Sequence, residues 1–305
     1  MPRRSRLGLI AAALVSIGLS AGAASGDPAE FLSAFRWTGE DARLGGLSAI
    51  DLSPDGSRFV VLSDRGAMAE GRFLRDGEGA ITGIEVPPLT LLEDGDGAPL
   101  RPGRSDSEGI ARAPDGTIYI SFEGAARVLA YDRIGGPARS LPRPEAFRRM
   151  QANSALEALA IDSRGRLFTL PERSGAEDRP FPVHVFDGRA WSQPFSIPRD
   201  GPFLPVGADF GPDGRLYLLE RDFHGLGGFA NRVRAFTLGP DGPLDAEVVL
   251  QTRLGSRDNL EGIAVWRDDR GRIRLTMVSD DNFRFFLRQQ VVEYVLPVDG
   301  RPVGG

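Results

Sequence analysis

The sequence contains no cysteine and no lysine. Without cysteine the protein has no disulfide, no thiol nucleophile and no thiolate metal ligand, so its stability must come from packing. All 37 basic residues are arginines, and the only histidines are His184 and His224. No Gly-x-Ser-x-Gly motif is present, which argues against a conventional serine triad.

Long helical patterns are also missing. No extended stretch places apolar residues at helical spacing, whereas 39 glycines and 23 prolines suit a chain that turns every few residues. We therefore expect an all-β protein. The net charge of -5 argues against nucleic acid as the main ligand, because a surface that binds nucleic acid requires a basic stripe.

The N-terminal segment has the layout of a cleaved secretory signal. An apolar run, Leu7–Leu19, follows three arginines and precedes several small alanines. The run is too short for a stable membrane anchor. We expect residues 1–26 to be the signal, residues 27–305 to form one domain, and the mature protein to be a periplasmic or secreted monomer with no membrane attachment. The pair Arg3-Arg4 leaves twin-arginine export open beside the general secretory route.

The stretch Asp106–Glu123 is the clearest structural unit in the chain. An apolar run leads into Pro114-Asp115-Gly116, a turn sequence, and apolar residues then alternate along a second run. This pattern predicts an antiparallel hairpin. Because such a hairpin brings its outer ends together, Glu108 and Glu123 should lie at the same end.

The hairpin pattern recurs five times. The turn glycines are separated by 60, 49, 49 and 57 residues and are Gly56, Gly116, Gly165, Gly214 and Gly271. A period of roughly 40–50 residues with about four strands is typical of a propeller blade. We predict a β-propeller of five blades, each of four antiparallel strands, closed by pairing of Phe31–Trp37 with the last strand. A sixth blade within Glu93–Arg104 or Pro137–Ala152 is the competing count.

Acidic residues recur at two positions of the repeat. The first-strand position, eight residues before the turn glycine, holds Ser48, Glu108, Glu157 and Val206, and Glu261 in the longer fifth copy. The end of the second strand, the exit position, is assigned to Asp64, Glu123, Glu172, Glu220 and Asp280. All should meet at one mouth of the ring, with the first-strand set nearest the axis.

Such a group of carboxylates requires neutralisation. Two like charges about 4 Å apart cost roughly 4 kcal/mol at an effective dielectric constant of 20. A hard cation, raised carboxyl pKa values, or the arginines that follow three exit acids, Arg65, Arg173 and Arg221, could each provide it. Oxygen ligands and export favour calcium. Asn153, Asn259 and Asn282 would add neutral oxygen donors.

One other reading of these residues stays open. Acids at strand ends can cap turns and pair with arginine, so the set could be structural.

Of the histidines, His184 lies in an alternating run and is expected to be an outer-strand residue, whereas His224 lies in a glycine-rich loop on the acidic side and is the better candidate for proton transfer.

The motifs resemble those of the phytase-like family, also called the esterase-like activity of phytase domain. The residues that carry the resemblance are Asp106–Ala111, Ser121–Gly124, Leu156–Ala160 and Leu218–Phe223. The resemblance implies an exported bacterial propeller with ester or phosphoester hydrolase activity. Ser48 and Val206 replace the first-strand acid in two copies and no lysine is available to bind phosphate, which argues against phytate itself as the substrate.

Together these observations predict a calcium-dependent hydrolase of a small-molecule ester or phosphoester. The expected metal ligands are Glu108, Glu157 and Glu261, helped by Glu123, Glu172 or Asp280. His224 or the exit carboxylate Glu220 would take a proton, and Arg221 would stabilise developing negative charge. The alternatives are a non-catalytic propeller that binds a ligand or partner at the same mouth, and a calcium-dependent lactonase.

Overall fold

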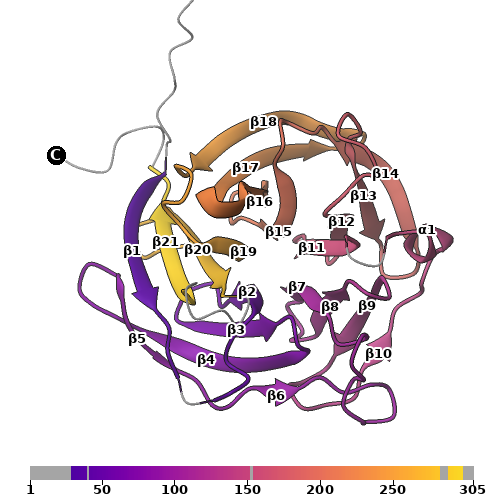
Figure 1. The fold of residues 1–305 in the computed structure, drawn as a ribbon, viewed down its shortest axis with the longest axis horizontal. Coiled ribbons are helices and arrows are strands. Elements are labelled where there is room, and N and C mark those ends of the chain that lie inside the picture. The colour runs from indigo at the N-terminus through magenta and orange to yellow at the C-terminus, as the bar shows by residue number, and fades with distance from the viewer. Residues whose placement is uncertain (1–28, 40, 152–153, 282–287, 298–305) are drawn as a thin grey trace, which may run out of the picture.

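The computed structural model describes residues 29–39, 41–151, 154–281 and 288–297. Five antiparallel sheets stand around a common axis as the blades of a propeller (Figure 1). Within each blade the first strand lies nearest the axis, and the inner strands of successive blades contact one another around the ring. The prediction of a five-bladed propeller is confirmed.

The blades follow one another along the chain. The first contains β2 (Leu47–Leu52), β3 (Arg58–Ser63), β4 (Ala67–Arg75) and β5 (Ile81–Glu85), with the short β6 (Thr90–Leu91) also paired to β4. The second contains β7 (Ser107–Arg112), β8 (Ile118–Phe122), β9 (Arg127–Tyr131) and β10 (Arg139–Ser140). The third contains β11 (Leu156–Ile161), β12 (Leu167–Pro171), β13 (Phe181–Phe186) and β14 (Trp191–Ile197). The fourth contains β15 (Leu204–Phe210), β16 (Leu216–Phe223), β17 (Phe229–Gly239) and β18 (Gly242–Gln251).

The fifth blade joins both ends of the described chain. β19 (Asn259–Arg267), β20 (Ile273–Asp280) and β21 (Gln290–Val295) are completed by β1 (Glu30–Arg36). β1 pairs antiparallel with β21, and Ala34 lies opposite Val292. The predicted closure of the ring by its two termini is therefore confirmed.

The two segments considered for a sixth blade do not form one. Glu93–Arg104 contributes a single bridge, between Glu93 and Pro99. The segment after Pro137 supplies β10, the outer strand of the second blade, and the short helix α1 (Glu145–Arg148). Phe147 of α1 is buried and anchors this crossing segment to the third blade.

The first hairpin of each blade is set by its turn glycine. All five turn glycines have positive φ, between 65° at Gly56 and 93° at Gly116, a conformation that side chains with a Cβ rarely adopt. The turns lie at one end of the ring. The other end holds the residues where each first strand begins and each second strand ends.

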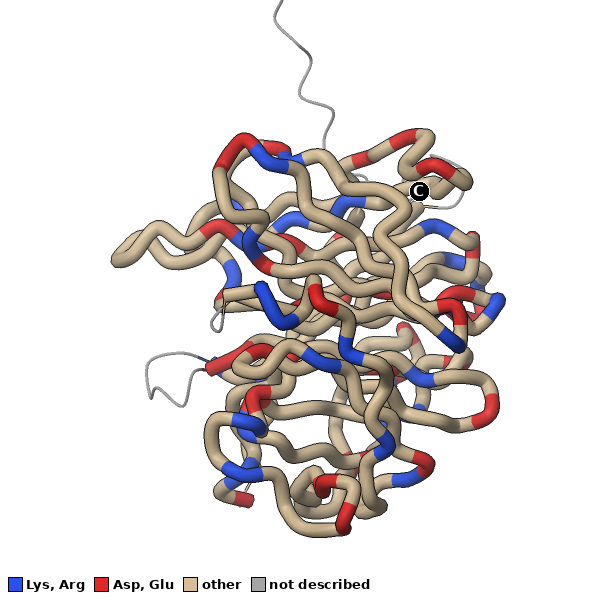
Figure 2. Tube along the Cα trace, turned by 90° about the vertical axis from the view of Figure 1, so that its right-hand side faces the viewer, with Lys and Arg blue, Asp and Glu red and all other residues tan. Residues whose placement is uncertain are grey.

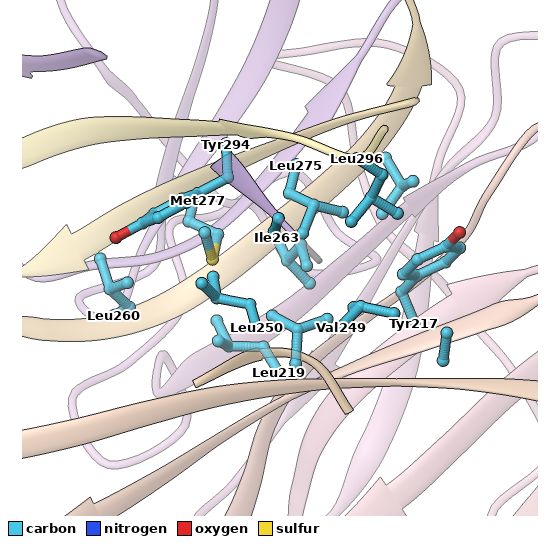
Figure 3. Packing of buried hydrophobic residues seen from close by; sticks show 14 of the residues in the cluster. Tyr217, Leu219, Val249, Leu250, Leu260, Ile263, Leu275, Met277, Tyr294 and Leu296 are labelled. Carbon is cyan, nitrogen blue, oxygen red and sulfur yellow. The ribbon is translucent and has the colours of Figure 1, made fainter. Parts of the chain in front are cut away.

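The core lies between neighbouring blades. Figure 3 shows the cluster between the fourth and fifth blades, where Leu219 of β16, Val249 of β18 and Met277 of β20 pack together. Each blade buries one face on each neighbour, so no blade can complete its core alone.

The charged residues on the outside are mixed in sign. On the side seen in Figure 2, arginines and acidic residues alternate without gathering into a basic stripe. Within the described ranges, no helix has the length and apolar character needed to cross a membrane. The predicted signal, residues 1–26, lies outside the described residues and stays a prediction.

Candidate functional site

The first strand of every blade carries a β-bulge near the position predicted to face the axis. Strand register shifts between Leu47 and Ala49, Ser107 and Ile110, Leu156 and Ala158, Pro205 and Gly207, and Leu260 and Gly262. The bulged segments contain the predicted first-strand residues Ser48, Glu108, Glu157, Val206 and Glu261. Bulges re-aim side chains and are common beside active sites.

The second strands end beside these bulges. The backbone amide of Glu123 donates to the carbonyl of Asp106 at 3.0 Å, and that of Glu172 donates to the carbonyl of Ala155 at 3.2 Å. Asp280 pairs with Asn259 in the fifth blade. Glu108 and Glu123 therefore lie at one end of their hairpin, as predicted. We call this end of the ring, defined by Asp106, Glu108, Glu123, Glu157, Glu172, Arg221, Asn259, Glu261 and Asp280, the acidic mouth.

Strand register corrects one assignment, that of Glu220 to the exit position. Leu156 pairs with Pro171, the residue before Glu172, and Pro205 pairs with Glu220. The residue equivalent to Glu172 is therefore Arg221. A one-residue shift in a strand moves a side chain to the opposite face. The exit positions thus hold four acids, Asp64, Glu123, Glu172 and Asp280, and one arginine.

Glu220 consequently lies inside the fourth blade. Its side chain is fully buried, and its two oxygens accept hydrogen bonds from Arg232 at 2.8 Å and from Arg234 at 2.5 and 2.8 Å. Two guanidinium groups compensate the burial of this carboxylate. This environment suits a structural ion pair and does not offer a base that a substrate could reach.

Three carboxylates at the mouth are close enough to bind one cation. Oxygens of Asp106, Glu108 and Glu123 lie within 4.8 Å of one another. No ion pair found among the described residues involves any of the three. Glu157, Glu172, Glu261 and Asp280, which were also predicted as ligands, do not belong to this group. A set of carboxylate oxygens without a neutralising arginine matches the ligands that calcium takes in proteins.

The pKa values report the crowding of negative charge in this group. Burial, followed by Glu157 and Glu261, raises the pKa of Glu108 well above its ordinary value. Burial, followed by Asp106 and Glu172, raises the pKa of Glu123 to about 7. A cation at this position would relieve the same repulsion.

Arg221 neutralises the other side of the mouth. Its guanidinium contacts Glu261 and lies 3.3 Å from Glu172, and it donates to Asn259 Oδ1 at 2.8 Å. Asn259 Nδ2 in turn donates to Glu261 at 2.8 Å and to Asp280 at 3.4 Å. Burial opposes the charge of Arg221, but Glu261, Glu157 and Glu172 outweigh it and raise its pKa. Glu172, Glu261 and Asp280 thus belong to an arginine-centred network.

Glu157 lies between the two halves of the mouth. Burial raises its pKa well above the ordinary value, Arg221 opposes the shift, and Glu123 and Glu172 add to it. Glu157 is also hydrogen-bonded to Glu123 through their side chains. A proton shared between these two carboxyl groups would reduce the repulsion between buried Glu157 and half-buried Glu123.

His224 lies at the edge of the mouth, in the loop between β16 and β17. Its Nε2 is 2.7 Å from Asp222 Oδ2, and its side chain is half-exposed. His184, by contrast, is buried on β13 with its ring edge-on to Phe147, and burial lowers its pKa to about 4.

Sequence reasoning missed Asp106 as a site residue. Asp106 lies two residues before Glu108, and residues two apart along a strand point to the same side. Asn259 holds the same position relative to Glu261. That spacing was the available signal. Of the other predicted oxygen donors, Asn153 and Asn282 lie outside the described residues.

Fold and site together define a five-bladed propeller with an acidic axial mouth, in which one half has three carboxylates without a paired arginine and the other half is neutralised by Arg221. A family model, Phytase-like, described as "Esterase-like activity of phytase", matches residues 42–283. The chain belongs to the phytase-like family. No curated protein sequence matches it.

Solved structures share the fold at low sequence identity. The α-L-arabinofuranosidase PaAbf62A from Podospora anserina, in complex with cellotriose, is 13% identical with a TM-score of 0.52, over 88% of this chain and 96% of that chain. The catalytic domain of the Coprinopsis cinerea GH62 α-L-arabinofuranosidase is 14% identical with a TM-score of 0.50, over 86% and 97%. A putative gluconolactonase is 14% identical over 87% and 94%, with a TM-score of 0.45. Similarity at these identities describes the fold alone.

Proposed function

We propose that this protein is a metal-dependent hydrolase of an ester or phosphoester, with calcium held by Asp106, Glu108 and Glu123. The observation that carries the proposal is the group of three carboxylates with no paired arginine, beside a network in which Arg221 pairs with Glu172 and Glu261. Membership of a family described by esterase-like activity supports the reaction class. The same proposal includes export of the protein to a compartment where calcium is available.

Different residues of the protein would have different roles in the reaction. A bound calcium would polarise a carbonyl or phosphoryl oxygen and make a nearby water more acidic. Arg221, held in place by Glu172, Glu261 and Asn259, is positioned to stabilise negative charge that develops on the substrate. His224, oriented by Asp222, is the group at the edge of the mouth that can carry a proton to or from solvent.

A non-catalytic propeller remains the second candidate. Arg221 already has three partners at the mouth, as expected of a structural ion pair. Such a protein would bind a ligand or a partner through the same carboxylates. A calcium-dependent lactonase would share the proposed metal site and differ in substrate, so a lactone belongs in the test panel.

The test is the variant Glu108→Gln, with Glu85→Gln as the matched control. Glu85 pairs with Arg72 on the outer part of the first blade, where both side chains are exposed. Without calcium, Glu108→Gln should be at least as stable as wild type, because it removes a buried carboxyl whose pKa is already raised. Wild type and Glu85→Gln should gain thermal stability with calcium, and Glu108→Gln should not.

Turnover is measured on p-nitrophenyl esters, p-nitrophenyl phosphate and a lactone. We expect calcium-dependent hydrolysis that falls on the order of 100-fold in Glu108→Gln, the loss typical of removing a main electrostatic group. A calcium response that survives in Glu108→Gln would refute the metal site. Calcium binding without turnover on any substrate would favour the non-catalytic propeller.

A further inference from the structure

A pocket of about 1020 Å³ opens beside Arg221. One end is polar and is formed by Glu172, Arg221, Asn259 and Glu261 of the acidic mouth. The other end is lined by Phe223 at the end of β16, Leu226 in the loop that follows, and Phe229 at the start of β17. The pocket therefore combines Arg221, one of the proposed reacting groups, with an apolar wall, which we call the Phe223 wall and define by these three residues.

The Phe223 wall holds apolar side chains in water. Phe223 is 63% exposed and Leu226 is completely exposed, and both belong to the small set of large apolar residues that the described chain leaves uncovered. The ring of Phe223 stacks on that of Phe229 with centroids 4.8 Å apart. Apolar side chains kept on the surface beside a pocket are typical of a binding site, since covering them would release water.

The loop that presents this wall is fixed by backbone hydrogen bonds. The amide of His224 donates to Gly228 at 2.9 Å, and the amide of Gly255 donates to Phe229 at 2.9 Å. Phe229 also forms a bridge with Arg257. A wall fixed in advance loses little conformational freedom when a ligand covers it.

The charges around the pocket disfavour a polyanion. Three arginines, Arg173, Arg221 and Arg257, face four acids, which are Glu172, Asp222, Asp258 and Glu261. The arginines are also engaged: Arg221 pairs with Glu172 and Glu261, Arg173 pairs with Glu172, and Arg257 stacks on Phe31 and donates to Tyr294. An inositol polyphosphate would find no free cluster of cations here.

We propose that the Phe223 wall binds the apolar acyl group of an uncharged carboxylic ester, whose ester group lies toward Arg221. This assignment rests on the hydrolase function proposed above and names its substrate class. Hydrolysis adds water across the acyl C–O bond, so the acid and the alcohol are the two products. The wall sets the preference for long over short acyl chains.

The test compares p-nitrophenyl hexanoate with p-nitrophenyl acetate, which differ by four methylene groups. Wild type should have a kcat/KM at least about tenfold higher for the hexanoate, because each buried methylene group favours binding. Phe223→Ser and Leu226→Ser should lose most of this preference through a higher KM for the hexanoate, with little change for the acetate. Leu244→Ser is the matched control, since Leu244 is 74% exposed on the outer strand β18 and should not affect either substrate.

A binding measurement separates the two proposals. The probe is N-(4-nitrophenyl)hexanamide, an anilide analogue of the ester, titrated calorimetrically into wild type and the three variants. Hydrolysis without chain-length preference, or the same preference in Phe223→Ser and Leu226→Ser, would overturn the acyl wall and leave the hydrolase intact. If no substrate is hydrolysed, weaker amide binding by Phe223→Ser than by Leu244→Ser would support the Phe223 wall alone. Equal amide binding by these two variants would overturn it.

Discussion

Glu220 and Arg221 are consecutive residues with opposite environments. Their side chains leave β16 on opposite faces, so Glu220 enters the interior of the blade and Arg221 enters the mouth. Counting from the turn glycine distinguishes these two positions, because Glu123, Glu172 and Arg221 each lie seven residues after their turn glycine and Glu220 lies six. The residue that interrupts the ring of exit acids is thus the one that neutralises its neighbours.

His184 gives a residue-scale prediction about pH. Burial lowers its pKa to about 4, whereas an unfolded histidine has a pKa of about 6.5. Between these values the unfolded chain binds a proton that the folded protein does not, so stability is present above pH 6.5 and is lost as the pH falls toward 4. Two and a half pKa units correspond to about 3 kcal/mol.

The measurement is urea unfolding of wild type and His184→Gln between pH 7 and pH 4. The variant does not titrate at this position, and the carboxylates common to both proteins cancel in the difference. We expect the wild type to lose up to about 3 kcal/mol relative to the variant over this range. Parallel stability curves would contradict the assignment.

At the scale of the element, the bulged first strand explains both the site and the close packing of the blades. A small residue ends each register shift or lies within it: Ala49, Gly109, Ala158, Gly207 and Gly262. A Cβ added at Gly207 would lie 2.4 Å from the carbonyl oxygen of Glu261, on the neighbouring blade. In four of the five blades the bulge holds a glutamate or a valine, and in all five the next residue is glycine or alanine.

Gly207→Ala should consequently destabilise the protein by about 1–3 kcal/mol, the usual cost of overpacking. The backbone of the fifth blade would have to move at Glu261, so the proposed activity should fall as well. Gly77→Ala is the control, because nothing lies within 4 Å of a Cβ at that position. Chemical denaturation of both variants decides the matter, and equal stabilities would show that the blades are not in close contact at Gly207.

The site could be predicted in part from these elements. The hairpin pattern located Glu108 and Glu123 at one end, because a tight turn fixes which residues face each other. The division of the mouth could not be predicted, since it depends on contacts between blades such as Arg221 with Glu172 and Glu261. Asp106 could have been predicted from its spacing of two residues from Glu108, but it was missed.

At the scale of the whole molecule, closure of the ring depends on β1. A chain that starts at Trp37 lacks β1 and leaves the edge of β21 unpaired, whereas a chain that starts at Ala29 keeps it. Unpaired strand edges promote association with other chains. We expect the shorter chain to form oligomers or aggregates with a lower melting temperature, measured by light scattering and circular dichroism. A monomer with an unchanged melting temperature would show that closure does not need this strand.

The sequence by itself determined the class, the repeated hairpin and the strand that closes the ring, because turn chemistry and alternating apolar residues act locally and repeat along the chain. Only the tertiary structure decided which carboxylates share space with an arginine and which do not. That outcome depends on register and on distances between blades far apart in the sequence, where one bulge or one residue of shift moves a charge to the other face of its strand.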